Sequence, residues 1–159
     1  GEPMADDKTN AVRIAQSAGA AYRLHAYSCP GPLDGVTVAR LIGRPAEMVF
    51  KTLVAAGKSG GFWVFVVPVA KELDLKAAAR AAGEKSVAMI AARDITPVTG
   101  YVRGGCSPIG MKKAYPTLID DSARDLDAIV VSAGRLGVQL ELRPGDLVRL
   151  VNGRYAPLT

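Results

Sequence analysis

The chain has 159 residues, a length typical of one domain with a sizeable hydrophobic core. Hydrophobic residues make up 49% and charged residues 22%, which is ordinary for a globular protein, and the net charge of +5 permits an anionic partner without demanding one. No apolar run reaches the roughly 18–20 residues of a membrane span and no signal-peptide pattern opens the chain, so a membrane protein is excluded and a cytoplasmic location is expected.

The first half of the chain alternates short helices and strands. Residues 1–3 look like a cloning remnant ahead of a natural start at Met4. Hydrophobic periodicity, together with glycine and proline punctuation, predicts the elements that follow. In chain order they are a helix over 10–18, a strand over 22–27, a loop over 29–32, a helix over 36–42, a short helix beginning at Pro45, a strand over 49–55, a turn at 60–61, and a strand over 62–69 buried on both faces.

The second half continues this mixture. Asp74 is expected to cap a helix that ends at Gly83. No repeat, linker or low-complexity segment divides the chain, so we predict a single mixed α/β domain over 1–159, whose short strands curl into a barrel-like sheet. The predicted elements are a helix over 75–82, a strand over 87–91, a short helix or turn over 94–99 interrupted by Pro97, a loop over 104–110, strands over 118–119, 128–132 and 138–142, and a last helix beginning at Pro144.

Several common hydrolase mechanisms lack their residues in this sequence. His25 is the one histidine, so a histidine-rich metal site is excluded by counting, and no C-x-x-C pair is present. A Ser-His-Asp triad lacks the G-x-S-x-G elbow that would present its serine. Cys29 and Cys106 are expected to be unrelated free thiols, since disulfides are unusual in the cytosol. These absences remove the commonest hydrolase mechanisms.

Lys51 is the first candidate for chemistry. In the predicted strand it shares a face with Val49, Leu53 and Ala55, so a charge stands on an apolar face. One interpretation is a solvated lysine at the sheet edge, because buried lysines are rare. The other is a positioned ammonium that faces a phosphate or a polarised carbonyl.

The loop 104–110, which reads Gly-Gly-Cys-Ser-Pro-Ile-Gly, is the second candidate. Its three glycines allow a sharp turn and close approach of a ligand, and successive N–H groups in such a turn can bind an anion. Gly105 and Gly110 have the spacing of a P-loop, but Met111 stands at the lysine position, so nucleoside triphosphate binding is excluded. An ordinary hairpin loop is the alternative.

Tyr27 and Asp146 are two further polar candidates. Tyr27 ends the first predicted strand on its polar face. Asp146 lies in the first turn of the last predicted helix, where the helix dipole favours a carboxylate by roughly 0.3–1 kcal/mol. That structural role explains Asp146 without any function.

A series of longer segments occurs in a fixed order along the chain. They are Phe50-Lys51-Thr52-Leu53-Val54, Pro68-Val69-Ala70, Leu73-Asp74-Leu75-Lys76, Thr99-Gly100-Tyr101-Val102-Arg103-Gly104-Gly105-Cys106-Ser107-Pro108-Ile109-Gly110, Lys112-Lys113 and Pro116-Thr117-Leu118-Ile119-Asp120. With them the chain, from about Ala21 to Ala156, strongly resembles the bacterial Cys-tRNA(Pro) deacylases of the YbaK/EbsC type, which are relatives of the editing domain inserted in bacterial prolyl-tRNA synthetases. The F-K-T-L-V and G-G-x-S-P-x-G segments are specific in combination.

The resemblance implies a curled mixed sheet flanked by helices and a site without a metal. The essential lysine of the family falls on Lys51, and a tyrosine and an aspartate of its pocket match Tyr27 and Asp146. Cys106 stands where the family is usually aliphatic, so it is not expected to be catalytic. The substrate loop of the family falls on Gly104, Gly105, Ser107, Pro108 and Gly110.

The activity that the resemblance implies is hydrolysis of mischarged Cys-tRNA(Pro), in which the thiol of the substrate cysteine attacks its own ester. The implied partners are the acceptor end of tRNA(Pro) and, through a complex, prolyl-tRNA synthetase. Two alternatives stay open: a deacylase for another amino acid on the same tRNA, such as alanine, with water as the nucleophile, and a non-enzymatic module that binds tRNA or an anion. Residues 28–32 replace an acidic or histidine-bearing stretch common in relatives and bear on this choice.

Overall fold

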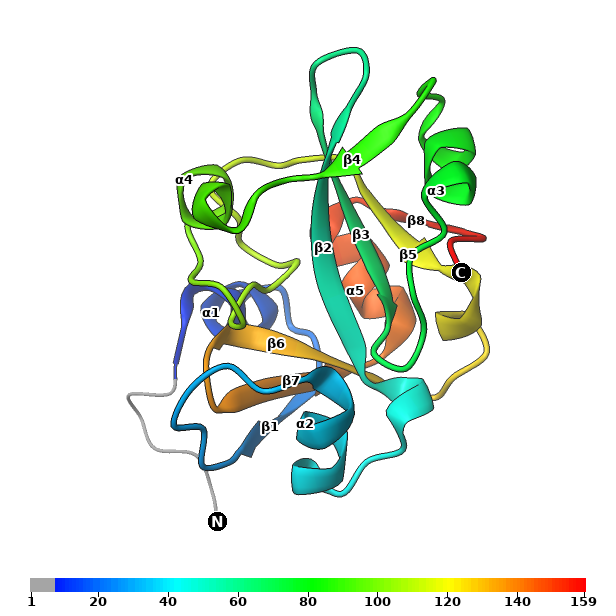
Figure 1. The fold of residues 1–159 in the computed structure, drawn as a ribbon. Coiled ribbons are helices and arrows are strands. Elements are labelled where there is room, and N and C mark those ends of the chain that lie inside the picture. The colour runs from blue at the N-terminus through cyan, green and yellow to red at the C-terminus, as the bar shows by residue number, and fades with distance from the viewer. Residues whose placement is uncertain (1–7) are drawn as a thin grey trace.

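The computed structural model describes residues 8–159, so the expected cloning remnant lies outside the described residues (Figure 1). The described chain forms two β-sheets with short helices around them. Within residues 8–159 the helices are all too short to cross a membrane. The helices are α1 (Asn10–Ser17), α2 (Gly35–Ile42), α3 (Leu75–Ala82), α4 (Ile95–Thr99) and α5 (Pro144–Val151), with single 3-10 turns η2 (Ala46–Met48), η3 (Ala92–Asp94) and η4 (Asp121–Ala123).

The smaller sheet has three antiparallel strands in the order β1-β7-β6. These are β1 (Tyr22–Ala26), β6 (Ile129–Arg135) and β7 (Val138–Leu142). The larger sheet has five strands in the order β4-β2-β3-β5-β8, namely β2 (Phe50–Gly57), β3 (Phe62–Pro68), β4 (Val87–Met89), β5 (Thr117–Asp120) and β8 (Arg154–Ala156). Strands β4, β2 and β3 pair antiparallel, whereas β5 pairs parallel with both β3 and β8.

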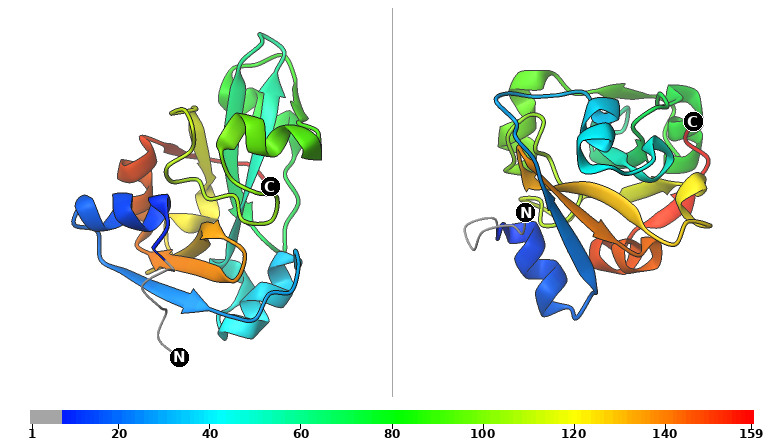
Figure 2. Two further views of the ribbon diagram at one scale, coloured as in Figure 1. Left: turned by 90° about the vertical axis from the view of Figure 1, so that its left-hand side faces the viewer. Right: turned by 90° about the horizontal axis from the view of Figure 1, so that it is seen from below.

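The prediction of a barrel-like sheet is wrong. Among the described residues one isolated bridge, between Val49 and Val130, joins the two sheets, and the strand orders of both sheets are open. Figures 1 and 2 show the two sheets meeting at an angle near the start of β2. A barrel needs a continuous hydrogen-bonded ring of strands, and here side-chain packing takes the place of that ring.

Hydrophobic cores fill both sides of the larger sheet. Helix α5 lies behind β2 and β3 in Figure 1, and the quarter turn in Figure 2 places α1 on the same side. Val64 and Val66 point into that core, whereas Phe65 and Val67 pack with Ala78 of α3 on the other side. The prediction that this strand is buried on both faces is therefore confirmed, with these four β3 residues at 0% exposure.

Local signals place most helix ends where the sequence predicts them. The Asp74 carboxylate accepts hydrogen bonds from the amides of Lys76 and Ala77 at 3.0 and 3.1 Å, and Gly83 ends α3 in the left-handed conformation. Pro97 lies inside α4 rather than interrupting it, because a residue in the first turn has no intrahelical partner for its amide.

A polar cluster fixes the end of α2 on the smaller sheet. The Glu141 carboxylate on β7 accepts hydrogen bonds from Arg44 Nε at 2.7 Å and from His25 Nε2 at 3.0 Å. Burial by itself raises the pKa of Glu141, but the two hydrogen bonds outweigh it and hold that pKa below its ordinary value. Because Arg44 follows α2 directly, this cluster positions the helix over the junction of the sheets.

Candidate functional site

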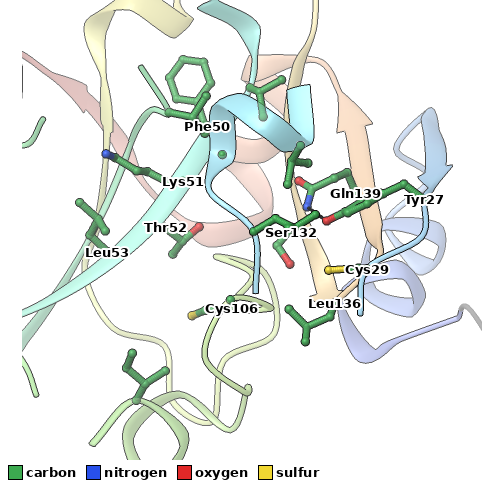
Figure 3. Close-up of a pocket in the computed structure, with 17 residues that line it drawn as sticks. Tyr27, Cys29, Phe50, Lys51, Thr52, Leu53, Cys106, Ser132, Leu136 and Gln139 are labelled. Atoms are coloured by element: carbon green, nitrogen blue, oxygen red, sulfur yellow. Dashed lines mark hydrogen bonds between the residues drawn. The ribbon is translucent and has the colours of Figure 1, made fainter. Parts of the chain in front are cut away.

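A cavity of about 260 Å³ lies at the junction of the two sheets (Figure 3). Its walls come from β2, from β6 and β7, from α2, and from the loop that follows α4. Most of the lining is apolar, with a few polar groups among it. Pockets for drug-sized ligands usually measure about 300–1,000 Å³, so this cavity suits a smaller group.

Lys51 lies on the cavity wall formed by β2, and its side chain is 29% exposed. Its ammonium lies 3.6 Å from the carboxylate of Glu72, which is itself 96% exposed. In Figure 3 the Lys51 side chain leads away from Tyr27 and Gln139 on the opposite wall. The structure thus combines the two interpretations of this residue: its stem lines the cavity and its charge reaches the solvated rim, where a phosphate can approach.

Tyr27 lines the opposite wall, next to β1. Its hydroxyl accepts a hydrogen bond from Gln139 Nε2 at 3.1 Å, which leaves the phenolic proton free to be donated. Burial raises the pKa of Tyr27 and outweighs that hydrogen bond, so the phenol stays protonated at neutral pH. Gln139, a residue that the sequence pattern did not single out, is the side chain that orients this donor.

Thr52 is a second polar residue that sequence reasoning missed. Among the described residues, its Oγ1 is the one buried side-chain polar atom without a hydrogen bond, and Thr52 lines the cavity. Ser132 lines the cavity too, and its Oγ accepts a hydrogen bond from the amide of Gly134 at 3.1 Å. A buried polar atom without a partner costs about 1–3 kcal/mol, so a polar group of a ligand would find a ready partner in Thr52.

The structure divides the 104–110 loop between two cavities. Gly104 and Cys106 line the first cavity, whereas Pro108 and Gly110 line a second one. Within residues 8–159 the amides of Gly104 and Cys106 have no hydrogen-bond acceptor, so they are free to bind an oxygen atom of a ligand.

The two remaining residues of the predicted substrate loop support its shape. An added Cβ at Gly105 would meet the backbone of Arg135 and Leu136 at 3.2 Å, so the loop packs closely on the β6–β7 turn there. Ser107 is fully buried, and its Oγ accepts a hydrogen bond from the amide of Ile109 at 3.2 Å. Neither Gly105 nor Ser107 lines the first cavity.

Cys106 and Cys29 are both free thiols that line the first cavity. Burial raises the pKa of Cys106 to about 11. Because the thiolate is the nucleophilic form, a raised pKa makes this thiol a weaker nucleophile at neutral pH. That agrees with the expectation that Cys106 is not catalytic.

Asp146 does not line either of the cavities described above. It lies in the first turn of α5 and forms an ion pair with Arg149, one turn further along the helix. These contacts fit the structural role suggested by its sequence position, in which a carboxylate stabilises the first turn of a helix. The polar partner of Tyr27 is Gln139 instead.

Comparisons with known proteins identify a family. The model of the aminoacyl-tRNA editing domain matches residues 34–150. A curated protein of Enterococcus faecalis, EbsC, provisionally described as a Cys-tRNA(Pro)/Cys-tRNA(Cys) deacylase, is 42% identical over 153 residues, which cover 96% of this chain and 93% of the relative.

Two solved structures share the fold. One is provisionally described as a trans-editing enzyme for prolyl-tRNA synthetase, with a TM-score of 0.85, 19% identity and 99% of both chains covered. The other is a hypothetical protein with a TM-score of 0.84 and 24% identity, covering 94% of this chain and 99% of that one. The family match and the curated relative together establish that the chain belongs to the aminoacyl-tRNA editing family, whose members act on aminoacyl-tRNA.

Proposed function

We propose that the protein hydrolyses mischarged Cys-tRNA(Pro) in trans, with the aminoacyl group bound in the first cavity. The observation that carries this proposal is the cavity itself: about 260 Å³, largely apolar, and lined by Lys51, Tyr27, Gly104 and Cys106. Its size suits a small aminoacyl group. The curated relative supports cysteine as that group.

The nucleophile in this proposal is the substrate thiol. The sulfur attacks the ester carbonyl, the bond from the carbonyl carbon to the ribose oxygen breaks, and the thiol proton ends on that oxygen. The product is a four-membered thiolactone, which water then opens to free cysteine. A thiol near its ordinary pKa of about 8.5 is a few per cent thiolate at pH 7, whereas a serine hydroxyl offers essentially no alkoxide.

The chain supplies binding and electrostatic stabilisation. The amides of Gly104 and Cys106 stabilise the negative charge that develops on the carbonyl oxygen of the ester. One such hydrogen-bond donor typically raises the rate by about 10²–10³. Lys51 binds a phosphate near the 3′ end or polarises the carbonyl. The hydroxyls of Tyr27 and Thr52 hold the aminoacyl group in place. Gly105 and Ser107 keep the loop in shape, and substrate binding by Pro108, Gly110 and Asp146 stays a prediction.

The alternative deacylase removes alanine from the same tRNA and uses water as its nucleophile. A side-by-side comparison of cysteinyl, seryl, alanyl and S-methylcysteinyl esters on tRNA(Pro) separates the two. We expect fast cleavage of the cysteinyl ester alone. If the S-methyl ester, which has no free thiol, is cleaved equally fast, the substrate-thiol mechanism is wrong. If none of the esters is cleaved, the protein is a binding module.

The proposed partners are the acceptor end of tRNA(Pro) and prolyl-tRNA synthetase, and the proposed location is the cytoplasm. The net charge is only +5, and the sequence has no run of basic residues longer than two, so tRNA binding should be weak. Three phosphate contacts to a single strand would give a slope of about −2 for log affinity against log salt concentration. A slope near zero would instead indicate recognition of the amino acid alone, or delivery of the substrate by a partner.

A further inference from the structure

A second cavity, of about 270 Å³, borders the same 104–110 loop and shares no lining residue with the first. Cys106 lines the first cavity and Pro108 lines the second. Their Cα atoms are two residues apart in sequence, so they lie within about 7 Å of each other. Stacked nucleotides advance by about 3.4 Å per strand, so one or two nucleotides span that distance.

The walls of the second cavity suit a flat, apolar-faced group. Tyr115 lines it, and its ring is held rigidly, because its hydroxyl donates a hydrogen bond to the carbonyl of Val98 at 2.6 Å and its ring contacts Phe62 edge to face at 5.8 Å between centroids. Met111 and Pro108 add apolar surface beside it. Fixed aromatic and apolar side chains of this kind stack on bases without regard to sequence.

The chain segment that contributes most of the lining of the second cavity carries a net positive charge. Residues 91–116 contain four basic side chains and one acidic side chain, a net +3 of the chain total of +5. Lys113 lines the cavity and none of the lining residues is acidic. Within residues 8–159, Lys113 forms no ion pair, and the Lys112 ammonium contacts only the carbonyl of Pro97, at 3.4 Å. Exposed, unpaired lysines beside an apolar cavity fit a phosphate next to a base.

We propose that the second cavity binds the nucleotide that precedes the terminal adenosine of the tRNA acceptor end. Its base stacks on Tyr115 and Met111, and the phosphate that links it to the terminal adenosine lies at Lys113, which lines the cavity, and at its exposed neighbour Lys112. The inference rests on the proposed function, because the ester must lie in the first cavity for this register to hold. The loop then separates the aminoacyl group from the nucleotide that anchors it.

The test compares two substrates: Cys-tRNA(Pro), and the cysteinyl ester of adenosine, which lacks the phosphate and the preceding nucleotide. One variant fills the second cavity through an exposed residue, Ala114→Trp, and Ala88→Trp on the exposed face of β4 is its control. The other variant reverses two charges, Lys112→Glu with Lys113→Glu. Its matched control carries Lys58→Glu with Lys85→Glu, both at exposed positions elsewhere.

Loss of the stacked base should raise KM for Cys-tRNA(Pro) in Ala114→Trp by roughly 5- to 150-fold, the equivalent of about 1–3 kcal/mol per base, with kcat unchanged. The Lys112/Lys113 variant should raise the same KM and flatten its salt dependence. Hydrolysis of cysteinyl-adenosine should be unchanged in both, and the controls should match the original protein throughout.

Two results would overturn the inference. An unchanged KM for Cys-tRNA(Pro) in Ala114→Trp would show that no nucleotide occupies the second cavity. An equal loss with both substrates would show that the substitutions act on the first cavity through the loop. If the unaltered protein cleaves neither cysteinyl substrate, the proposed function fails first. Binding of uncharged tRNA to the same variants, followed by fluorescence anisotropy, then tests the nucleotide site alone, and equal affinities for all variants would reject it.

Discussion

Replacement of Lys51 with alanine tests whether its charge serves the substrate or the fold. The ammonium lies 3.6 Å from Glu72, a distance at which two unit charges attract by about 1 kcal/mol in bulk water. Because the Glu72 side chain is 96% exposed, solvent screens this pair and its net contribution is about 0–1 kcal/mol. We therefore expect the free energy of unfolding of Lys51→Ala to fall by no more than about 1 kcal/mol.

The effect on deacylation should be much larger. A hydrogen bond to a charged group contributes about 1.5–3 kcal/mol. Loss of the contact between Lys51 and the substrate should therefore slow the reaction by about 10- to 150-fold or more. Single-turnover deacylation of Cys-tRNA(Pro) gives the rate, and urea unfolding gives the stability. Lys58→Ala, at an exposed turn, is the control for removal of one positive charge. Glu72→Ala should keep its activity, since this carboxylate only competes with the substrate for Lys51. A folded Lys51→Ala protein with near-normal turnover would refute the assignment.

Three further predictions concern the nucleophile, the metal and acid stability. Cys29→Ser and Cys106→Ser should both retain deacylation in the same assay, because burial keeps the Cys106 thiol protonated at neutral pH; loss of activity in either folded variant would implicate a protein thiol. Activity should survive exhaustive dialysis against EDTA, and a loss that a defined metal restores would contradict the proposed site. The pKa of Glu141 is depressed by Arg44 and His25, so its stabilisation is present above the unfolded pKa of about 4.3 and is lost as the pH falls through the lower folded value. Urea unfolding of Glu141→Gln should accordingly show a shallower loss of stability in acid than the original protein, and parallel curves would argue against this linkage.

The sequence predicts those parts of the fold that local chemistry decides. Asp74 and Gly83 bound α3 because a capping carboxylate and a left-handed glycine act within one helical turn. The barrel-like sheet was predicted wrongly, because strand pairing between distant segments leaves no local signal. Strand β8 was missed for a related reason: its three residues, Arg154–Ala156, are too few for alternation to be visible.

In the candidate site, too, the residues marked by a local motif were predicted and those that depend on strand pairing were not. Lys51 and the loop carry motifs that identify them, and the structure places Lys51, Tyr27 and Gly104 around one cavity. Gln139 was not predicted, because its contact with Tyr27 depends on the register of β1 on β7, in which Ala26 pairs with Val138. The assignment of Asp146 to the pocket remains a prediction, since its observed partner is Arg149.

The single bridge between Val49 and Val130 has a consequence for how substrate preference can diversify in this architecture. The two sheet walls of the first cavity are each braced by their own ladder of backbone hydrogen bonds, and side chains such as Leu53 and Leu136 line the gap between them. A substitution on one wall can widen or narrow the gap without re-pairing any strand. Related chains can therefore drift from one small amino acid to another while the lysine and the glycine loop stay in place. A saturation library at Leu136, selected on alanyl and cysteinyl esters, would reveal how few steps separate the two preferences.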